Sequence, residues 1–329
     1  MKNRLLLVIL LLCSFLTFGT SKVKKQLNIA VIYSVRGKGD KNRNDFAYEG
    51  LMKAKRDFGI EFKEFTQRIS VIDIEYQLRS LAKSEKYDLI IGIPEEMRPG
   101  VAVIAKEFPK QKFVVTYSPM DEKLPNVAAI LFREEEGGFL AGALAAMTTK
   151  TYSVGFIGSA QTPNVRKYEK GFKQGAKYIN EKLVTVSAYV EGESPRFDIS
   201  GGKKKAEEMI KKYRTGVIFH DAGGSGIGIL NAAQENKIFA ISSGQNEDKL
   251  APGTVLTSIM TDLSSPIYTL VKNAATGNFQ GREYYFGLSE NAIKTTGFIY
   301  TGDKVGRETT RKFEEIKDMI KNGKIKVQK

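Results

Sequence analysis

The chain has 329 residues, of which 42% are hydrophobic and 27% charged, and its formal net charge is +14. This length and apolar content are enough for two domains with buried cores. Its single Cys (Cys13) and single His (His220) exclude an internal disulfide and a zinc site of about four Cys and His ligands.

The first predicted element is a secretory signal peptide over residues 1–21. A basic start, "MKNR", precedes the apolar run "LLLVILLLCSFLTF" at 5–18, and small residues and charges follow. The run is shorter than the roughly 20 residues that span a bilayer, and no later segment approaches that length. We therefore expect an exported protein, periplasmic or on the cell surface. Cys13 either receives a lipid anchor, although the large Leu12 precedes it, or is removed with the peptide.

From residue 27 onward, short β-branched runs alternate with segments of helical period. In chain order the pattern predicts strand 27–33, helix 45–59, strand 62–67, helix 72–85, strand 88–93, helix 100–109, strand 112–117 and strand 127–132. Strands such as "DLIIGI" are almost continuously apolar, as in a parallel sheet covered on both faces. The alternation predicts an α/β fold with helices on both sides of the sheet.

The same pattern then starts again. It predicts helix 134–150, strand 153–158, helix 166–180, strand 184–190, helix 203–213, strand 216–221, helix 226–236 and strand 237–242. The small residues of 134–150 allow close helix packing. Segments 254–261, 265–278 and 284–296 run between the two sets, and the last helix is 307–323.

This arrangement predicts two Rossmann-like lobes with parallel sheets. The first lobe would comprise residues 27–132 and about 263–282, and the second residues 133–262 and about 283–329. Ligands of such folds bind beyond the carboxyl ends of the strands. We therefore expect a ligand site in the cleft between the lobes.

The stretch "VIFHDAGGSGIGI" at 217–229 ends a predicted strand with a glycine-rich turn. It lacks the Gly-Lys-Ser/Thr ending of a P-loop and the spacing of the dinucleotide fingerprint. Glycines at a helix start let backbone N–H groups approach a ligand. Phe219 either faces the cleft and stacks on a flat ring, or belongs to the core while the glycines only allow close packing.

Several blocks in this order resemble the basic membrane lipoprotein family, which contains purine-nucleoside receptors. They are "GDKNRNDFAYEG", "FPKQKFVV", "EEEGGFLAGALAA", "VGFIGS" and "VIFHDAGGSGIG", and the resemblance covers about residues 27 to 323. It implies the type I periplasmic-binding fold, with three crossings between two lobes. It also implies a non-enzymatic component of an ABC importer for nucleosides, which works with permease and ATPase subunits and requires no metal or cofactor.

The resemblance assigns some ligand contacts directly. Asn44 matches an Asn that bonds the base, and Phe219 matches an aromatic residue that stacks on it. Gly223 and Gly224 match the family's glycines, and Ser225 follows them in the same turn. Arg43 stands where the family has a second stacking aromatic residue, so a guanidinium would take that place.

Other family positions carry different residues here. Tyr117 stands where the family has a base-reading Asp, and Thr261 where it has a Lys. Gly244 or Gln245 replaces the Asp that binds the ribose hydroxyls, a loss of charge-assisted hydrogen bonds worth roughly 1.5–3 kcal/mol each. Asn246, Glu247 and Asp248 lie close enough to take over hydroxyl binding. The ligand is then anionic or differently shaped, or the site has degenerated.

Two other functions stay open. A nucleoside-processing enzyme would have His220 as the one group titrating near pH 7. An exported surface protein could bind anionic host polymers through its basic clusters, "GGKKK" at 201–205 and the tail at 322–329. Lys and Arg elsewhere are scattered among acids, which is typical of a solvated surface, so nucleic acid is not an expected partner.

Overall fold

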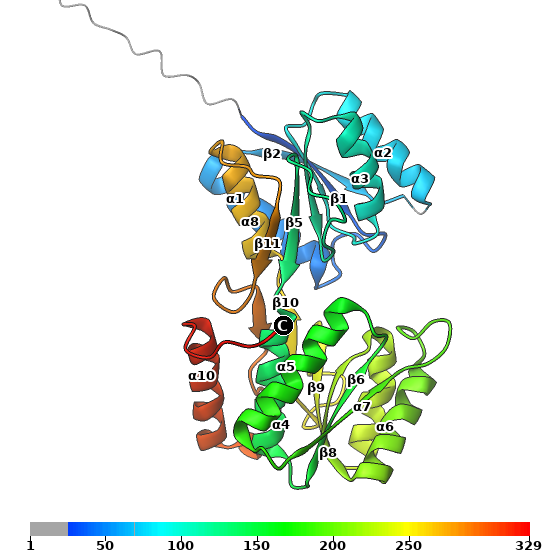
Figure 1. The fold of residues 1–329 in the computed structure, drawn as a ribbon, viewed down its shortest axis with the longest axis vertical. Helices are drawn as coiled ribbons and strands as arrows, with labels where there is room; N and C mark the ends of the chain where they lie inside the picture. The colour runs from blue at the N-terminus through cyan, green and yellow to red at the C-terminus, as the bar shows by residue number, and fades with distance from the viewer. Residues whose placement is uncertain (1–25, 69) are drawn as a thin grey trace, which may run out of the picture.

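A computed structural model describes residues 26–68 and 70–329, which form two α/β lobes one above the other in Figure 1. The predicted signal peptide and Cys13 lie outside the described residues. In the described part of the chain, no helix combines the length and hydrophobicity needed to cross a membrane.

The first lobe contains a six-stranded, wholly parallel sheet in the order β11-β5-β4-β3-β1-β2. Its strands are β1 (Asn28–Tyr33), β2 (Glu61–Thr66), β3 (Leu89–Gly92), β4 (Lys112–Thr116), β5 (Val127–Phe132) and β11 (Glu283–Phe286). Helices α1 (Arg43–Phe58), α2 (Val71–Lys83), α3 (Met97–Glu107) and α8 (Ser264–Ala275) cover it.

Successive residues of β1 serve opposite faces of this sheet, as the strand period requires. Ile29 and Val31 pack in the cluster that contains α1 and α8, whereas Ala30 and Ile32 pack in the cluster that contains α2 and α3. The continuous apolar strands are therefore explained by burial on both sides.

The second lobe has a sheet in the order β12-β10-β9-β8-β6-β7, parallel except for the antiparallel β10–β12 pair. Its strands are β6 (Ser153–Gly158), β7 (Val184–Tyr189), β8 (Thr215–Asp221), β9 (Phe239–Gly244), β10 (Val255–Thr261) and β12 (Ile293–Thr295). Its helices are α4 (Glu134–Thr148), α5 (Pro163–Ile179), α6 (Ile199–Tyr213), the 3-10 turn η1 (Gly223–Ser225), α7 (Gly226–Glu235), α9 (Gly302–Val305) and α10 (Arg307–Lys321).

Helices α4 and α5 pack with their backbones nearly in contact because glycines line the seam. A Cβ built on Gly142 would lie 2.0 Å from the Phe172 carbonyl oxygen, and one on Gly175 would lie 1.9 Å from that of Phe139. The predicted role of the small residues in this segment is confirmed.

The chain passes between the lobes three times, after β5, after β10 and after β11. The two-lobed α/β fold with three crossings is thus confirmed. One expected boundary is wrong: residues from about 283 were assigned to the second lobe, but β11 pairs with β5 in the first sheet. This four-residue strand gains its place only by hydrogen bonding at the sheet edge, which no local sequence pattern specifies.

Several helix ends follow their sequence signals. Helix α1 stops at Gly59, whose φ of 65° is left-handed and whose N–H bonds the Lys55 carbonyl. Helix α5 begins after Thr162, whose hydroxyl accepts the Val165 N–H, with Pro163 in the first turn. These ends fix where the loops at the carboxyl edges of the sheets begin.

Candidate functional site

The candidate site lies where the carboxyl ends of β4 and β5 meet the second lobe. In Figure 1 the arrow of β5 points toward the second lobe, which contains helix α5. Tyr117 directly follows β4 and is 4% exposed. Its ring stacks on Phe132, with centroids 5.0 Å apart at 29°. The Arg43 guanidinium, at the start of α1, lies over the same ring, 3.8 Å from its centroid.

Tyr117 also connects the two lobes. Its Oη lies 3.3 Å from Thr261 Oγ1 at the end of β10, and its carbonyl accepts a hydrogen bond of 3.0 Å from Asn164 Nδ2 of α5. Its φ of 64° is left-handed, which costs a bulky residue of order 1–3 kcal/mol. Burial raises the pKa of the Tyr117 hydroxyl, although the positive charge of Arg43 partly offsets this. Tyr117 is therefore a neutral side chain on a strained backbone, in contact with both lobes.

A second tyrosine brings a free hydroxyl to this region. Tyr168 of α5 is buried, and its Oη has no hydrogen-bond partner within the described part of the chain. Burial raises its pKa well above 10, and the negative charges of Asp221 and Glu134 raise it further, whereas Arg43 lowers it. A buried hydroxyl without a partner costs roughly 1–3 kcal/mol, so this donor can be satisfied by a polar ligand atom.

Arg43 is held among acids. Its side chain is 33% exposed, and one nitrogen lies 3.8 Å from a Glu95 carboxylate oxygen. Burial lowers the pKa of the guanidinium, but Tyr117 and the acids Glu95, Glu96 and Asp221 outweigh it, so the pKa is raised overall. Arg43 therefore stays charged beside Tyr117.

Asn44 lies next to Arg43, but its amide is occupied by the loop before α1. Its Oδ1 accepts the Ser34 N–H at 3.1 Å, and its Nδ2 donates to Ser34 Oγ at 2.8 Å and to the Gly37 carbonyl at 2.7 Å. Asn44 is wholly buried. It positions the loop that presents Arg43, and its predicted base contact would require these bonds to be exchanged.

Phe219 does not face the cleft in this structure. The side chain is 0% exposed and sits among Phe156, Tyr168 and Phe172, with ring centroids 5.6–5.7 Å away. Its position on β8 points it to the α4–α5 side of the sheet, which is filled by aromatic side chains. Of the two placements considered from sequence, this structure has Phe219 in the core.

The glycine turn packs against a neighbouring loop. Atoms built as Cβ on Gly223 and Gly224 would each lie 3.2 Å from the Arg196 carbonyl oxygen, and Gly223 has a φ of 58°. Ser225 is buried; its Oγ accepts the Asp198 N–H and donates to the Pro195 carbonyl, both at 2.8 Å. These contacts give the three residues a structural part in holding the loop at 195–198.

Asn246 is exposed and accepts the Asp248 N–H through its side chain at 3.1 Å. The structure thus brings Arg43 and Tyr117 together, with Asn44 beside them, and leaves Phe219 and Asn246 out of contact with this group. Phe132, Asn164 and Tyr168 also belong to this region, and no sequence pattern had marked them as site residues. Phe132 ends a strand, and the other two lie in the first turns of a helix that follows one, the positions where ligands of open α/β sheets bind.

His220 follows Phe219 on β8 and is buried at 1% exposure. Its Nε2 lies 3.1 Å from Ser242 Oγ and 3.3 Å from Glu247 Oε2. Burial acts to raise the pKa of Glu247, but the interactions of its carboxylate with His220, Ser242 and Gln245 lower it overall. Among the described residues no group of His, Cys, Asp or Glu is arranged to hold a metal ion.

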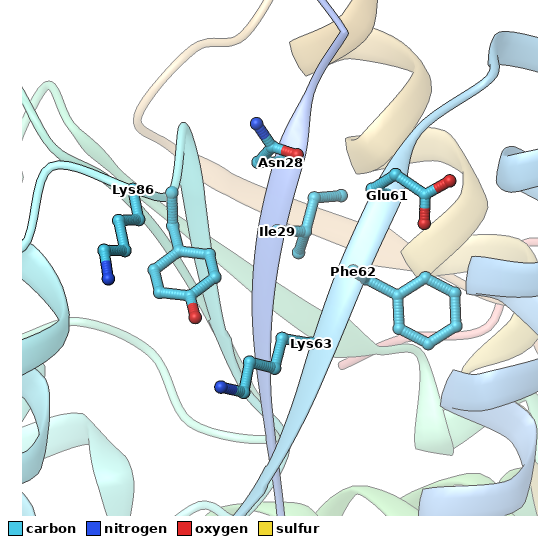
Figure 2. A pocket seen from close by; sticks show the side chains of 7 residues that line it. Asn28, Ile29, Glu61, Phe62, Lys63 and Lys86 are labelled. Atoms are coloured by element: carbon cyan, nitrogen blue, oxygen red, sulfur yellow. The ribbon is translucent and has the colours of Figure 1, made fainter.

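A hollow of about 320 Å³ lies away from these residues, at the amino edge of the first sheet. Figure 2 shows Lys63 and Lys86 on one side of the β1–β2 pair and the Phe62 ring on the other. Since these side chains diverge, the hollow lacks the convergent polar groups of a ligand site.

The similarity to known proteins extends over both lobes. The family model described as ABC transporter substrate-binding protein PnrA-like matches residues 27–329. Basic membrane protein A1 of Borrelia garinii subsp. bavariensis is 30% identical, over 98% of this chain and 95% of its own. A lipoprotein of Pyrococcus abyssi is 25% identical over 94% of this chain and 78% of its own. An ABC transporter solute-binding protein from Aeropyrum pernix K1 superposes with a TM-score of 0.70 at 25% identity, covering 91% and 92% of the two chains.

Proposed function

The chain belongs to the family of PnrA-like ABC transporter substrate-binding proteins, and on that basis we propose that it captures a nucleoside or a related planar small molecule between its lobes. Closure of the two lobes around the ligand, a known hinge motion, presents it to the permease and ATPase subunits of an importer. The protein acts outside the cytoplasm, held at the membrane surface by a lipid on Cys13. Relatives that are named lipoproteins support this anchoring.

The observation that carries the proposal is the surroundings of Tyr117. A guanidinium and an aromatic ring both contact its planar side chain, and the unpartnered Tyr168 hydroxyl lies on the facing lobe. Stacking on such groups contributes about 1–3 kcal/mol per base where nucleic-acid bases are bound. The free hydroxyl offers a polar contact to the edge of a ring or to a sugar.

In the proposed function the protein binds its ligand and releases it chemically unchanged. His220 is the one imidazole of the chain, and it is enclosed with its Nε2 in contact with Ser242 and Glu247. A general base must come within hydrogen-bond reach of its substrate. The His220 ring is 1% exposed, so it presents no accessible nitrogen to a substrate in this structure.

No observation favours the polymer-binding alternative. In the cluster at 201–205, Lys203 pairs with Glu235 and Lys205 with Glu191, each at 2.8 Å. In the tail, Gln328 exchanges hydrogen bonds with Gln174 of α5, and Lys329 Nζ lies over the Tyr285 ring. These groups are engaged within the protein.

Native mass spectrometry of the gently purified protein, followed by thermal unfolding with adenosine, guanosine, inosine and uridine, tests the proposal. We expect a retained small molecule or a saturable rise in Tm with at least one nucleoside. A ligand at 100 times its Kd stabilises by about 2.7 kcal/mol. Chromatography should recover the nucleoside intact. A protein with no retained molecule and no response to the panel would contradict the nucleoside assignment, and release of free base would indicate an enzyme.

A further inference from the structure

Tyr117 occupies the region between the lobes that the proposed function assigns to the ligand. It is a planar ring with a polar edge, in contact with the Arg43 guanidinium and the Phe132 ring. A ring-shaped ligand at these same surfaces would have to displace it. The protein therefore supplies its own occupant for this part of the site.

The same residue ties the lobes together without a ligand. The side-chain contact to Thr261 and the hydrogen bond from Asn164 both join Tyr117 of the first lobe to the second. Asn164 lies in the first turn of α5, in the second lobe, so a hinge motion that moves α5 away from the end of β4 breaks this bond. The left-handed backbone at Tyr117 shows that the position is not one a tyrosine prefers by itself.

The Tyr168 hydroxyl indicates that Tyr117 is an incomplete substitute. It is buried in the facing lobe and has no hydrogen-bond partner among the described residues, although the charges of Arg43, Asp221 and Glu134 all act on it. A ligand that reaches this hydroxyl offers a bond that Tyr117 does not make. Such a ligand can replace Tyr117, whereas a bare ring cannot.

We infer that Tyr117 is a built-in competitor of the ligand, which keeps the empty lobes closed and selects for planar ligands with a polar group that reaches Tyr168. The inference rests on the proposed function only in taking the space between the lobes as the ligand site. Because apparent affinity falls with the fraction of protein that is competent to bind, a form that is open in about 1% of molecules binds about 100-fold more weakly.

The test measures lobe separation with and without the tyrosine ring. Spin labels on Ile72→Cys and Phe197→Cys, exposed residues of the two lobes, report the distance in a Cys13→Ser background, since Cys13 is the one native cysteine. We expect Tyr117→Gly, which suits the left-handed backbone, to shift the distances to longer values. Millimolar p-cresol, the tyrosine side-chain analogue, should restore the short distance. Tyr117→Phe should stay closed.

Tyr33→Ala is the matched control. Tyr33 is also buried at a strand end, but the groups that act on its charge, Glu64, Tyr48 and Asp45, all belong to the first lobe. Its removal should leave the distances unchanged with or without p-cresol. If Tyr117→Gly does not fold, Tyr117→Asn replaces it, because Asn also tolerates a left-handed backbone.

A Tyr117→Gly protein as closed as the wild type, or one that p-cresol does not close, overturns the inference. The two proposals fail separately. If the wild type binds no nucleoside while Tyr117→Gly opens and p-cresol closes it, the nucleoside assignment falls and the competitor stands. If the wild type binds a nucleoside and Tyr117→Gly neither opens nor gains affinity for it, the nucleoside assignment stands and the inference that Tyr117 competes with the ligand falls.

Discussion

The Arg43 guanidinium lies 3.8 Å from the centre of the Tyr117 ring, across 74 positions of sequence. In a partly desolvated setting such a cation–π contact contributes up to about 2 kcal/mol, against about 0.5–1 kcal/mol for an exposed one. The pair thus joins the first residue of α1 to the residue that follows β4. Its strength can be measured by substitution.

Arg43→Ala should lower the free energy of unfolding by about 1–2 kcal/mol in urea denaturation, because it removes this contact and the packing of the side chain. Lys38→Ala is the comparison, since Lys38 Nζ lies over the Tyr48 ring at 4.1 Å in a more exposed place. It should cost less than 1 kcal/mol. Equal losses in the two variants would show that the Arg43 contact gains nothing from its burial.

Phe219→Ala should destabilise the fold by about 3–5 kcal/mol, because it leaves a cavity among Phe156, Tyr168 and Phe172. In the other placement considered from sequence, at the cleft wall, the substitution would instead weaken ligand binding and spare folding. Phe197→Ala, at a residue that is 70% exposed, should change stability by less than about 0.5 kcal/mol. Calorimetric unfolding of both variants measures the two losses of stability. A Phe219→Ala protein that is as stable as the wild type but has lost ligand affinity would show that Phe219 lines the cleft.

Gly175→Ala should separate α4 from α5, since the added methyl would lie 1.9 Å from the Phe139 carbonyl oxygen. We expect a loss of about 1–3 kcal/mol or more from overpacking, seen as a lower Tm. Gly302→Ala is the control, because a Cβ there meets nothing within 4 Å. A Gly175→Ala protein that melts with the wild type would mean that the helix seam yields without cost.

Glu134→Gln should flatten the dependence of stability on pH. Burial raises the pKa of Glu134 to about 7 from 4.5, although Lys167 at 2.9 Å opposes this. Between these values the folded protein holds a proton that the unfolded chain releases, so the free energy of unfolding falls as pH rises. At 1.36 kcal/mol per pKa unit, the loss from pH 4 to pH 8 reaches about 3 kcal/mol.

The measurement is urea unfolding of wild type and Glu134→Gln at intervals from pH 4 to pH 8. Glu193→Gln removes the same charge from an exposed loop and should keep the wild-type profile. A Glu134→Gln protein whose stability still falls between pH 4.5 and pH 7 as steeply as that of the wild type would assign the proton to another group.

The sequence by itself determined most of the elements and their order, whereas the short β11, β12 and α9 carried no local signal. Apolar β-branched runs, the helical period, Gly59 after α1 and Pro163 at the start of α5 are local signals, and each acts through neighbours within a few residues. The blocks shared with the transporter family added the two lobes and three crossings, because a family pattern carries the topology with it.

Only the tertiary structure decided the site. Tyr117 meets Thr261 across 144 positions, β11 joins the first sheet through its edge hydrogen bonds, and Phe219 turns into the aromatic core rather than the cleft. None of these follows from local pattern, because each depends on which surfaces the two sheets bring together. A strand period places a side chain on one face of its sheet, but the packing of the helices determines whether that face is core or cleft.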